Sequence, residues 1–190
     1  MLELNIVPNR YANGREIALK IAFFGPAGAG KGSALAALHR ALRPETRGQI
    51  VSVTTGSDRT LFFDFFPMPT PRLRSSGLRV QIYTTTGEVN SDSTRRALLE
   101  DVKGVIFLAD SQRERELDNA LALEHLRESL GALGLRLDAL PHVFAWNKRD
   151  LSPLLSAEEL SGRLNRDRQP AFETVATTGR GLFEALKALT

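Results

Sequence analysis

Residues 24–33 have the sequence FGPAGAGKGS, and this stretch decides the fold that the rest of the chain must adopt. The apolar run Ile17 to Phe24 precedes it and predicts a buried strand, while residues 33–42 predict a helix with leucines at helical spacing. A strand, a glycine loop that ends in Gly-Lys, and a helix together form a phosphate-binding arrangement. Glycine allows consecutive backbone N–H groups to turn towards phosphate oxygens and to approach them closely.

The loop also predicts which residues contact the phosphates, namely Gly25, Gly28, Ala29, Gly30, Lys31, Gly32 and Ser33. Lys31 reaches the outer phosphates, and the helix dipole favours their negative charge. One position departs from the usual pattern, in which Ser or Thr follows the lysine and binds Mg²⁺. Gly32 stands there, and Ser33 is rotated by about 100° around the helix. We therefore expect Ser33 to contact the α-phosphate and any Mg²⁺ to be held through water.

Length and composition limit the other possibilities. The 190 residues predict one domain, 1–190, with residues 1–15 as an N-terminal extension. The net charge of +3 is too small to indicate a nucleic-acid partner, and the lack of cysteine excludes disulfides and thiolate metal sites. Apolar runs such as Val105 to Ala109 are far shorter than the roughly 20 residues that span a bilayer. We expect a cytoplasmic protein with no integral membrane segment and no secretion signal.

Strands and helices are predicted to alternate along the chain. The predicted strands after the first are 61–66, 78–83, 102–109, 142–146 and 172–175, and the predicted helices after the first are 93–100, 114–133, 156–164 and 181–189. Residues 43–60 are expected to form a long connection, and Thr84 to Glu88 a turn-like loop. Ser156, with Glu159 three residues later, predicts a capping box at the start of helix 156–164. The pattern predicts an α/β fold with a mostly parallel central sheet, helices on both faces, and a ligand at the carboxyl ends of the strands.

A second motif, Asn147-Lys148-Arg149-Asp150, directly follows an apolar strand. A carboxylate at Asp150 can accept hydrogen bonds from both the ring N–H and the exocyclic amine of guanine. Adenine presents a donor and an acceptor the other way round, so it would leave a polar group unpaired. The motif therefore predicts guanine binding by Asn147, Lys148 and Asp150. In contrast, we expect the charged residues 113–116 to be a solvated helix start.

At this motif the sequence resembles the Ras-like small GTPases, whose corresponding motif is NKxD. Val175-Ala176-Thr177 occupies the place of the loop in which an alanine N–H of those proteins contacts the guanine oxygen, so Ala176 and Thr177 join the predicted site. The stretches RTLFFDF, from Arg59, and YTTTGE, from Tyr83, narrow the resemblance to the bacterial MglA-type polarity GTPases. That family has RTLFFDF at switch I and YTVPGQ at switch II, and like this chain it lacks the Asp of the DxxG motif. The similarity extends from about residue 10 to the end of the chain.

The resemblance implies a Ras-like P-loop fold of three layers that binds GTP or GDP with Mg²⁺. By position, Arg59 matches the intrinsic arginine finger of the family, and Thr60 matches the switch I threonine that senses Mg²⁺ and the γ-phosphate. Gly87 and Glu88 fall in switch II. The resemblance further implies a partner like MglB, a Roadblock-type homodimer, along with other polarity effectors and recruitment from the cytoplasm to a cell pole. We expect the phenylalanines between 62 and 66 to add an apolar partner surface.

Three departures fall on the hydrolysis machinery: Gly32, Thr86 in place of proline, and Glu88 in place of the glutamine that orients water. A carboxylate cannot donate a hydrogen bond as an amide does, and it repels the γ-phosphate. If Arg59 offsets this charge, Glu88 can still act as a catalytic base for water. Two alternatives therefore stay open, a GTPase switch with weak or partner-dependent hydrolysis and a pseudo-GTPase that works as an interaction module. The loop also resembles GxPGxGKGT of nucleoside monophosphate kinases, but Asn147 to Asp150 have no role there, and no arginine-rich lid is evident.

Overall fold

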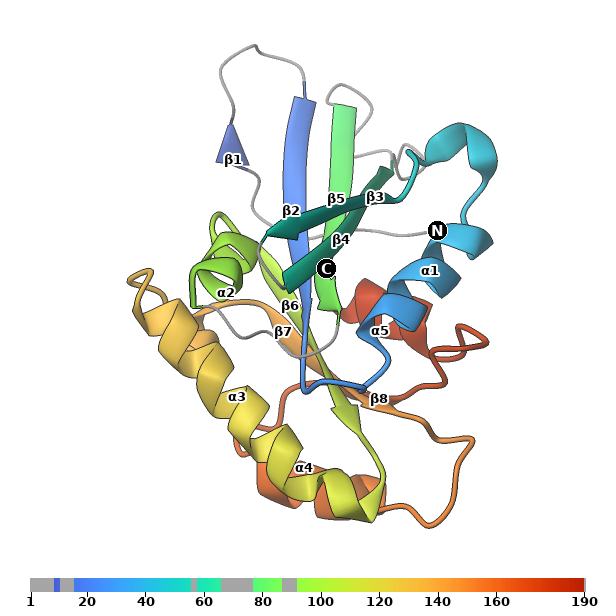
Figure 1. Ribbon diagram of the computed structural model, residues 1–190, viewed down its shortest axis with the longest axis vertical. Coiled ribbons are helices and arrows are strands. Elements are labelled where there is room, and N and C mark those ends of the chain that lie inside the picture. The colour runs from blue at the N-terminus through green and yellow to red at the C-terminus, as the bar shows by residue number, and fades with distance from the viewer. Residues whose placement is uncertain (1–8, 11–15, 56–57, 66–76, 87–91, 190) are drawn as a thin grey trace.

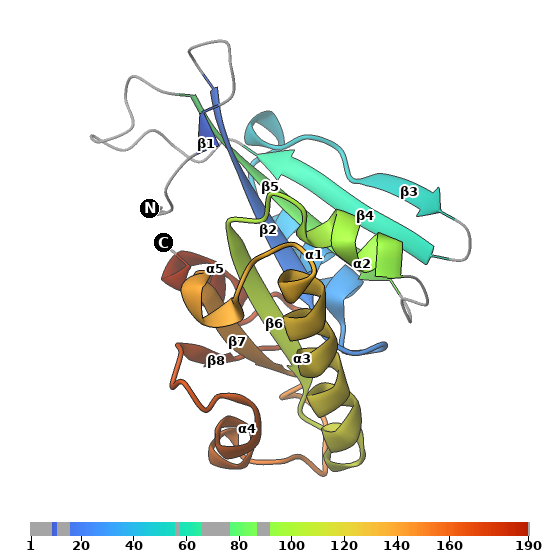
Figure 2. The same ribbon diagram turned by 90° about the vertical axis from the view of Figure 1, so that its left-hand side faces the viewer.

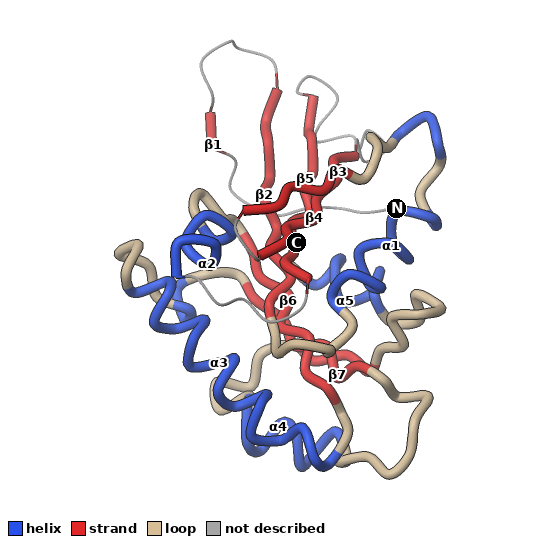
Figure 3. The backbone as a smooth tube through the Cα atoms, viewed as in Figure 1, coloured by secondary structure: helices blue, strands red, loops and turns tan. Residues whose placement is uncertain are grey.

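The computed structural model describes residues 9–10, 16–55, 58–65, 77–86 and 92–189, and within these ranges a layer of strands lies between two layers of helices (Figure 1 and Figure 3). The described strands form one eight-stranded sheet in the order β3-β4-β5-β2-β6-β7-β8, with β1 paired to β2. Their bounds are β1 Asn9–Arg10, β2 Glu16–Phe24, β3 Val51–Thr55, β4 Asp58–Phe65, β5 Gly77–Thr86, β6 Gly104–Asp110, β7 His142–Asn147 and β8 Ala171–Glu173.

The central strands are parallel, which confirms the predicted α/β class. β2 pairs in parallel with both β5 and β6, and β6-β7-β8 continue the parallel set, whereas β3-β4-β5 are joined in antiparallel fashion. Every residue of β6 and β7 is buried. Burial along a whole strand is expected where helices cover both faces of a parallel sheet, and it explains the uninterrupted apolar run in β6.

Five α-helices within the described residues supply those two covers: α1 Lys31–Ala41, α2 Asp92–Leu99, α3 Glu116–Gly131, α4 Ala157–Leu164 and α5 Leu182–Ala188. One hydrophobic core joins the sheet to α1 and α5, through side chains such as Leu35, Leu38 and Leu186. A second core joins the other face to α2, α3 and α4, with Leu99, Leu126 and Leu160 among its members. Figure 2 looks onto the face that α2 and α3 cover.

Two predicted loops are wrong. The connection predicted for 43–60 contains the strand β3 and the first residues of β4, which form an antiparallel hairpin with Val51 opposite Phe62. The turn-like loop predicted from Thr84 does not begin there, because β5 continues to Thr86 and pairs with β4 as far as Arg59. In both cases hydrogen bonding to a neighbouring strand forms or extends a strand that the local sequence does not predict.

Several element ends also differ from prediction. Helix α1 begins at Lys31, two residues before the predicted start, since Gly30 is its N-cap. The predicted helix 114–133 divides into a 3₁₀ turn, Arg113–Arg115, and α3. Strand β6 spans 104–110 instead of 102–109, and β8 spans 171–173 instead of 172–175. The change in β6 matters for the site, because Asp110 becomes the last residue of a strand.

The capping box predicted at the start of α4 is confirmed. The Ser156 hydroxyl accepts a hydrogen bond from the Glu159 amide (3.1 Å), and the Glu159 carboxylate accepts one from the Ser156 amide (2.7 Å). Two of the amides that a helix start leaves unpaired are thus satisfied. No helix among the described residues is both long enough and apolar enough to cross a membrane.

We predict that Ser156→Ala lowers the free energy of unfolding by about 1 kcal/mol, because the N-terminal amides of α4 lose their acceptor. Urea unfolding of the two proteins measures the difference. Ser161→Ala, which changes a serine inside the same helix, is the matched control and should shift the free energy by less than about 0.5 kcal/mol. Equal losses in both variants would contradict the capping role.

Candidate nucleotide-binding site

The loop between β2 and α1 needs glycine at specific positions. Gly25, Gly28 and Gly30 have φ values of +146°, +75° and +92°, a region that residues with side chains rarely adopt. Space is also lacking, since a Cβ atom at Gly25 would lie 2.1 Å from the Leu108 carbonyl oxygen, and one at Gly30 would lie 2.5 Å from Nδ2 of Asn147. The glycines therefore let this loop pack against β6 and β7 with its backbone exposed to a ligand.

The carbonyl groups of the loop are held by side chains. Asn147 Nδ2 donates to the Ala29 carbonyl (2.7 Å), and an Arg115 guanidinium nitrogen donates to the Ala27 carbonyl (2.7 Å). In a trans peptide unit the carbonyl and the following amide point in opposite directions. Fixing both carbonyls therefore turns the amides of the next residues to the other side of the loop, as an anion-binding nest requires.

Lys31 is 5% exposed, and its ammonium donates to the carbonyls of Gly25 (2.9 Å) and Pro26 (2.8 Å). Burial lowers the pKa of Lys31 to about 8, because removing the ammonium from water disfavours its charged form. The two carbonyls are neutral dipoles, so they compensate the charge only in part. A phosphate group beside this ammonium would supply the missing negative charge.

Asn147 connects three loops at the carboxyl edge of the sheet. It is 1% exposed, and its Oδ1 accepts hydrogen bonds from the Ala176 amide (2.9 Å) and from the Thr174 hydroxyl (3.1 Å). Because its Nδ2 binds the Ala29 carbonyl, one side chain joins the ends of β7 and β8 to the phosphate loop. The structure thus brings together Ala29, Gly30, Asn147 and Ala176, which the sequence predicts as a single site.

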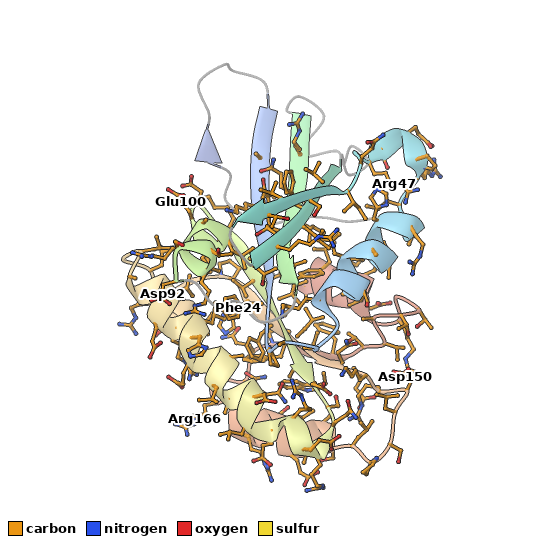
Figure 4. The ribbon with its side chains drawn as sticks, viewed as in Figure 1. Phe24, Arg47, Asp92, Glu100, Asp150 and Arg166 are labelled. Carbon is orange, nitrogen blue, oxygen red and sulfur yellow. The ribbon has the colours of Figure 1, made fainter. Side chains whose placement is uncertain are left out.

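The other residues of the second motif lie farther out. Lys148 has φ +65°, and its ammonium lies 2.6 Å from a carboxylate oxygen of Asp110 and donates to Gln112 (3.2 Å). Asp150 is exposed, and Figure 4 places it at the rim of the molecule on the loop that follows β7. Thr177 is exposed as well, and its carbonyl accepts from Arg40 (3.3 Å). An exposed carboxylate at the rim is available to an incoming base.

The residues predicted for hydrolysis and for Mg²⁺ are spread over several elements. Arg59 and Thr60 lie in strand β4, where Arg59 Nε donates to the Ser52 hydroxyl on β3 (2.7 Å). Gly32 and Ser33 lie in the first turn of α1, and Ser33 is exposed. Gly87, Glu88 and Phe66 lie outside the described residues, as do the side chains of Phe63, Phe65 and Thr86. Phe62 is described and stacks on Tyr83 with ring centroids 4.8 Å apart.

Sequence reasoning missed two residues of the site. Asp110 is fully buried at the end of β6, one residue beyond the strand that the sequence predicts. Arg115 is predicted to be solvated, and this prediction is wrong, because its guanidinium binds the phosphate loop and pairs with Asp118 (2.6 Å). The sequence does contain a signal for Asp110, because the end of an apolar strand at the ligand-binding edge of the sheet is an unusual place for a charged residue.

A cavity of about 310 Å³ adjoins the phosphate loop on the side of α2 and α3. The cavity extends from the first half of the phosphate loop to Thr85, near the end of β5. These two segments are the ones from which we expect contacts to an outer phosphate. The described residues that line it are Phe24, Gly25, Pro26, Ala27, Thr85, Arg95, Arg115, Asp118, Leu121, Ala122 and His125. Within the described part of the chain, no three His, Asp or Glu side chains are grouped so that they could hold a metal ion. The glycine cradle and the buried Lys31 ammonium fit a polyphosphate.

Comparison with known proteins identifies a close relative. The chain is 41% identical over 175 residues to the "Mutual gliding-motility protein MglA" of Myxococcus xanthus (strain DK1622), a match that covers 92% of this chain and 90% of that protein. No protein-family model matches the chain. The aligned region includes both the phosphate loop and the Asn147 motif, because it leaves out less than a tenth of the chain.

We predict that nucleotide affinity falls as the pH rises through the pKa of Lys31. A pKa of about 8 leaves the amine mostly charged at pH 7 and mostly neutral at pH 8.5. Only the charged form attracts phosphate, so the affinity for a nucleoside diphosphate should fall by about fourfold over this interval. Calorimetric titration at the two pH values measures the change.

Lys31→Arg is the matched control, since a guanidinium stays charged at both pH values. Its affinity for the diphosphate should be nearly the same at pH 7 and pH 8.5, whatever its absolute value. A fall of equal size in Lys31→Arg would show that another group causes the pH dependence.

Proposed function

The chain belongs to the MglA family of small Ras-like GTPases, and we propose that it is a guanine-nucleotide-dependent switch in bacterial cell polarity or motility. The observation that carries the proposal is the position of Asn147, which joins the phosphate loop to the loops after β7 and β8. A polyphosphate on the loop and a base beside Ala176 and Asp150 would then belong to one ligand, GTP or GDP. The whole chain, 1–190, serves as a single nucleotide-binding domain in this proposal, and residues 1–15 are its N-terminal extension.

We propose that hydrolysis of GTP to GDP and phosphate is weak or depends on a partner. Gly32 offers no hydroxyl to Mg²⁺, so we propose that the ion is held mainly by nucleotide oxygens and water, with Thr60 of β4 and Ser33 of α1 as the candidate protein hydroxyls. Arg59 engages Ser52 within the β3-β4 hairpin, and it must leave this contact to act on a phosphate. Such a movement is the kind of step that a bound partner can favour.

The partner we propose is a Roadblock-type homodimer like MglB. Support comes from the β3 edge of the sheet, which presents exposed apolar side chains next to the proposed switch I: Ile50, Val51 and Val53 are 37%, 42% and 46% exposed. The same surface would serve other polarity effectors. In this proposal the protein acts in the cytoplasm and gathers at a cell pole when such a partner holds it there.

A pseudo-GTPase is the second candidate. It is favoured by the combination of Gly32, Thr86 and Glu88, which all fall on the hydrolysis machinery, whereas the predicted guanine pocket keeps its pattern. A nucleoside monophosphate kinase is a weaker candidate, because a guanine-binding loop after β7 has no role in such an enzyme.

The first test concerns the base. We predict that the purified protein carries GDP or GTP, identified by chromatography after denaturation, and that Asp150→Asn changes its preference from guanine to xanthine. An amide at this position can donate to the carbonyl that xanthine carries in place of the guanine amine. Because the amide no longer accepts both guanine donors, the affinity for GDP should fall by roughly 10–100-fold. Competition binding with GDP and XDP measures the change.

The control is Asp167→Asn, an equivalent change at an exposed turn, which should leave the preference for GDP intact. Bound ATP, or no bound nucleotide at any Mg²⁺ concentration, would contradict the guanine switch. An unchanged preference in Asp150→Asn would remove Asp150 from the site.

The second test concerns hydrolysis. We expect Glu88→Gln to hydrolyse GTP roughly tenfold faster than the wild type, because an amide orients water without repelling the γ-phosphate. Arg59→Ala should be at least about tenfold slower than the wild type in the presence of the proposed Roadblock-type homodimer, if that partner activates hydrolysis. Phosphate release under single-turnover conditions, with and without the homodimer, measures all three proteins.

Equal GDP affinity in the three proteins is the control for folding. If all three release phosphate at the background rate even with the homodimer present, the pseudo-GTPase is correct. If Glu88→Gln is slower than the wild type, Glu88 acts as a base for water, and the proposed defect is wrong.

A further inference from the structure

Asp110 is a buried charge that the proposed function does not use. It is the last residue of β6 and is 0% exposed. Asn119 of α3 fixes its backbone on both sides, accepting from the Asp110 amide (2.8 Å) and donating to the Asp110 carbonyl (2.8 Å). Burial of a carboxylate is costly unless cations and donors surround it, so the position of this side chain demands an explanation.

Cations and a hydrogen-bond donor surround the Asp110 carboxylate. Its Oδ1 accepts from the Gln112 amide (3.1 Å), and its Oδ2 lies 2.6 Å from the Lys148 ammonium and 3.8 Å from Arg115 Nε. Within the described residues, Oδ2 has no hydrogen bond of good angular geometry, so its contact with Lys148 is an ion pair. The strongest partner of Asp110 is therefore a residue of the predicted guanine-binding motif.

Lys148 needs such a partner. Its φ of +65° lies in the left-handed region, which is unfavourable for a residue with a side chain and persists only where the surroundings impose it. The ion pair with Asp110 and the hydrogen bond to Gln112 draw the ammonium inward. With its charge fixed in this way, the methylene groups of Lys148 are the part of the side chain left to contact a base.

We infer that Asp110 is a positioning residue for guanine nucleotide, which holds Lys148 in the arrangement that receives the base. This inference rests on the proposed function, because Lys148 and Asp150 must bind guanine for it to matter. Asp110 itself touches no nucleotide in this account and acts through Lys148.

Asp110→Asn tests the inference, because it keeps the shape and the acceptor for the Gln112 amide but removes the charge. We expect GDP labelled with a fluorophore on its ribose to dissociate about tenfold faster from Asp110→Asn than from the wild type. Lys148→Met should increase the dissociation rate of GDP by a similar factor. The double variant should dissociate no more than about twofold faster than Lys148→Met, because a pair that acts as a unit is not additive.

Asp138→Asn, which changes a surface carboxylate paired with Arg136, is the matched control and should dissociate GDP at the wild-type rate. Thermal melting without nucleotide reports folding. If Asp110→Asn loses its cooperative melting transition, Asp110→Ser replaces it, since a hydroxyl also accepts from the Gln112 amide.

If the two increases in dissociation rate multiply in the double variant, to about a hundredfold in total, the inference is overturned, because Asp110 would then act other than through Lys148. Wild-type dissociation rates in Asp110→Asn would overturn it as well, while leaving the proposed function intact. A wild-type protein that binds no guanine nucleotide would overturn both.

Discussion

The buried amide of Asn147 is the contact on which the site depends. It donates to Ala29 in the phosphate loop and accepts from Ala176 and Thr174, so every polar atom of the side chain has a partner. Loss of such a side chain would leave buried backbone groups unpaired, at a cost of about 1–3 kcal/mol each. A single residue thus sets the distance between the segment suited to phosphates and the segment suited to a base.

The three cations of the site differ in their partners. Lys31 rests on two backbone carbonyls, and its pKa falls to about 8 because these dipoles replace water poorly. Lys148 and Arg115, in contrast, have carboxylate partners in Asp110 and Asp118. Within the described residues Lys31 has no carboxylate partner, and it is the cation that the loop presents to an incoming phosphate. The site is therefore set up to gain binding energy at Lys31 and to keep its other charges in place.

In the proposed function, the departures from the usual GTPase pattern concern catalysis, while the cradle keeps its contacts. The tight packing at Gly25 and Gly30 and the hydrogen bonds to Ala27 and Ala29 depend on the backbone and on residues of β6, β7 and the 3₁₀ turn Arg113–Arg115. Gly32 follows this cradle within the first turn of α1, and removing a hydroxyl there alters none of these contacts. A site of this kind can therefore retain nucleotide binding while its capacity for hydrolysis changes independently.

The sequence by itself determined the α/β class, the phosphate loop, the Asn147 motif and the capping box of α4, because each depends on residues close together in the chain or on a short apolar period. The tertiary structure alone decided that the region around Val51 is a strand, since β3 is held by β4, and that Asp110 and Arg115 belong to the site. Arg115 reaches a carbonyl 88 residues away, and Asn147 one that is 118 residues away. Local patterns carry no information about such pairs, because only the packing of parallel strands brings their carboxyl ends to one edge.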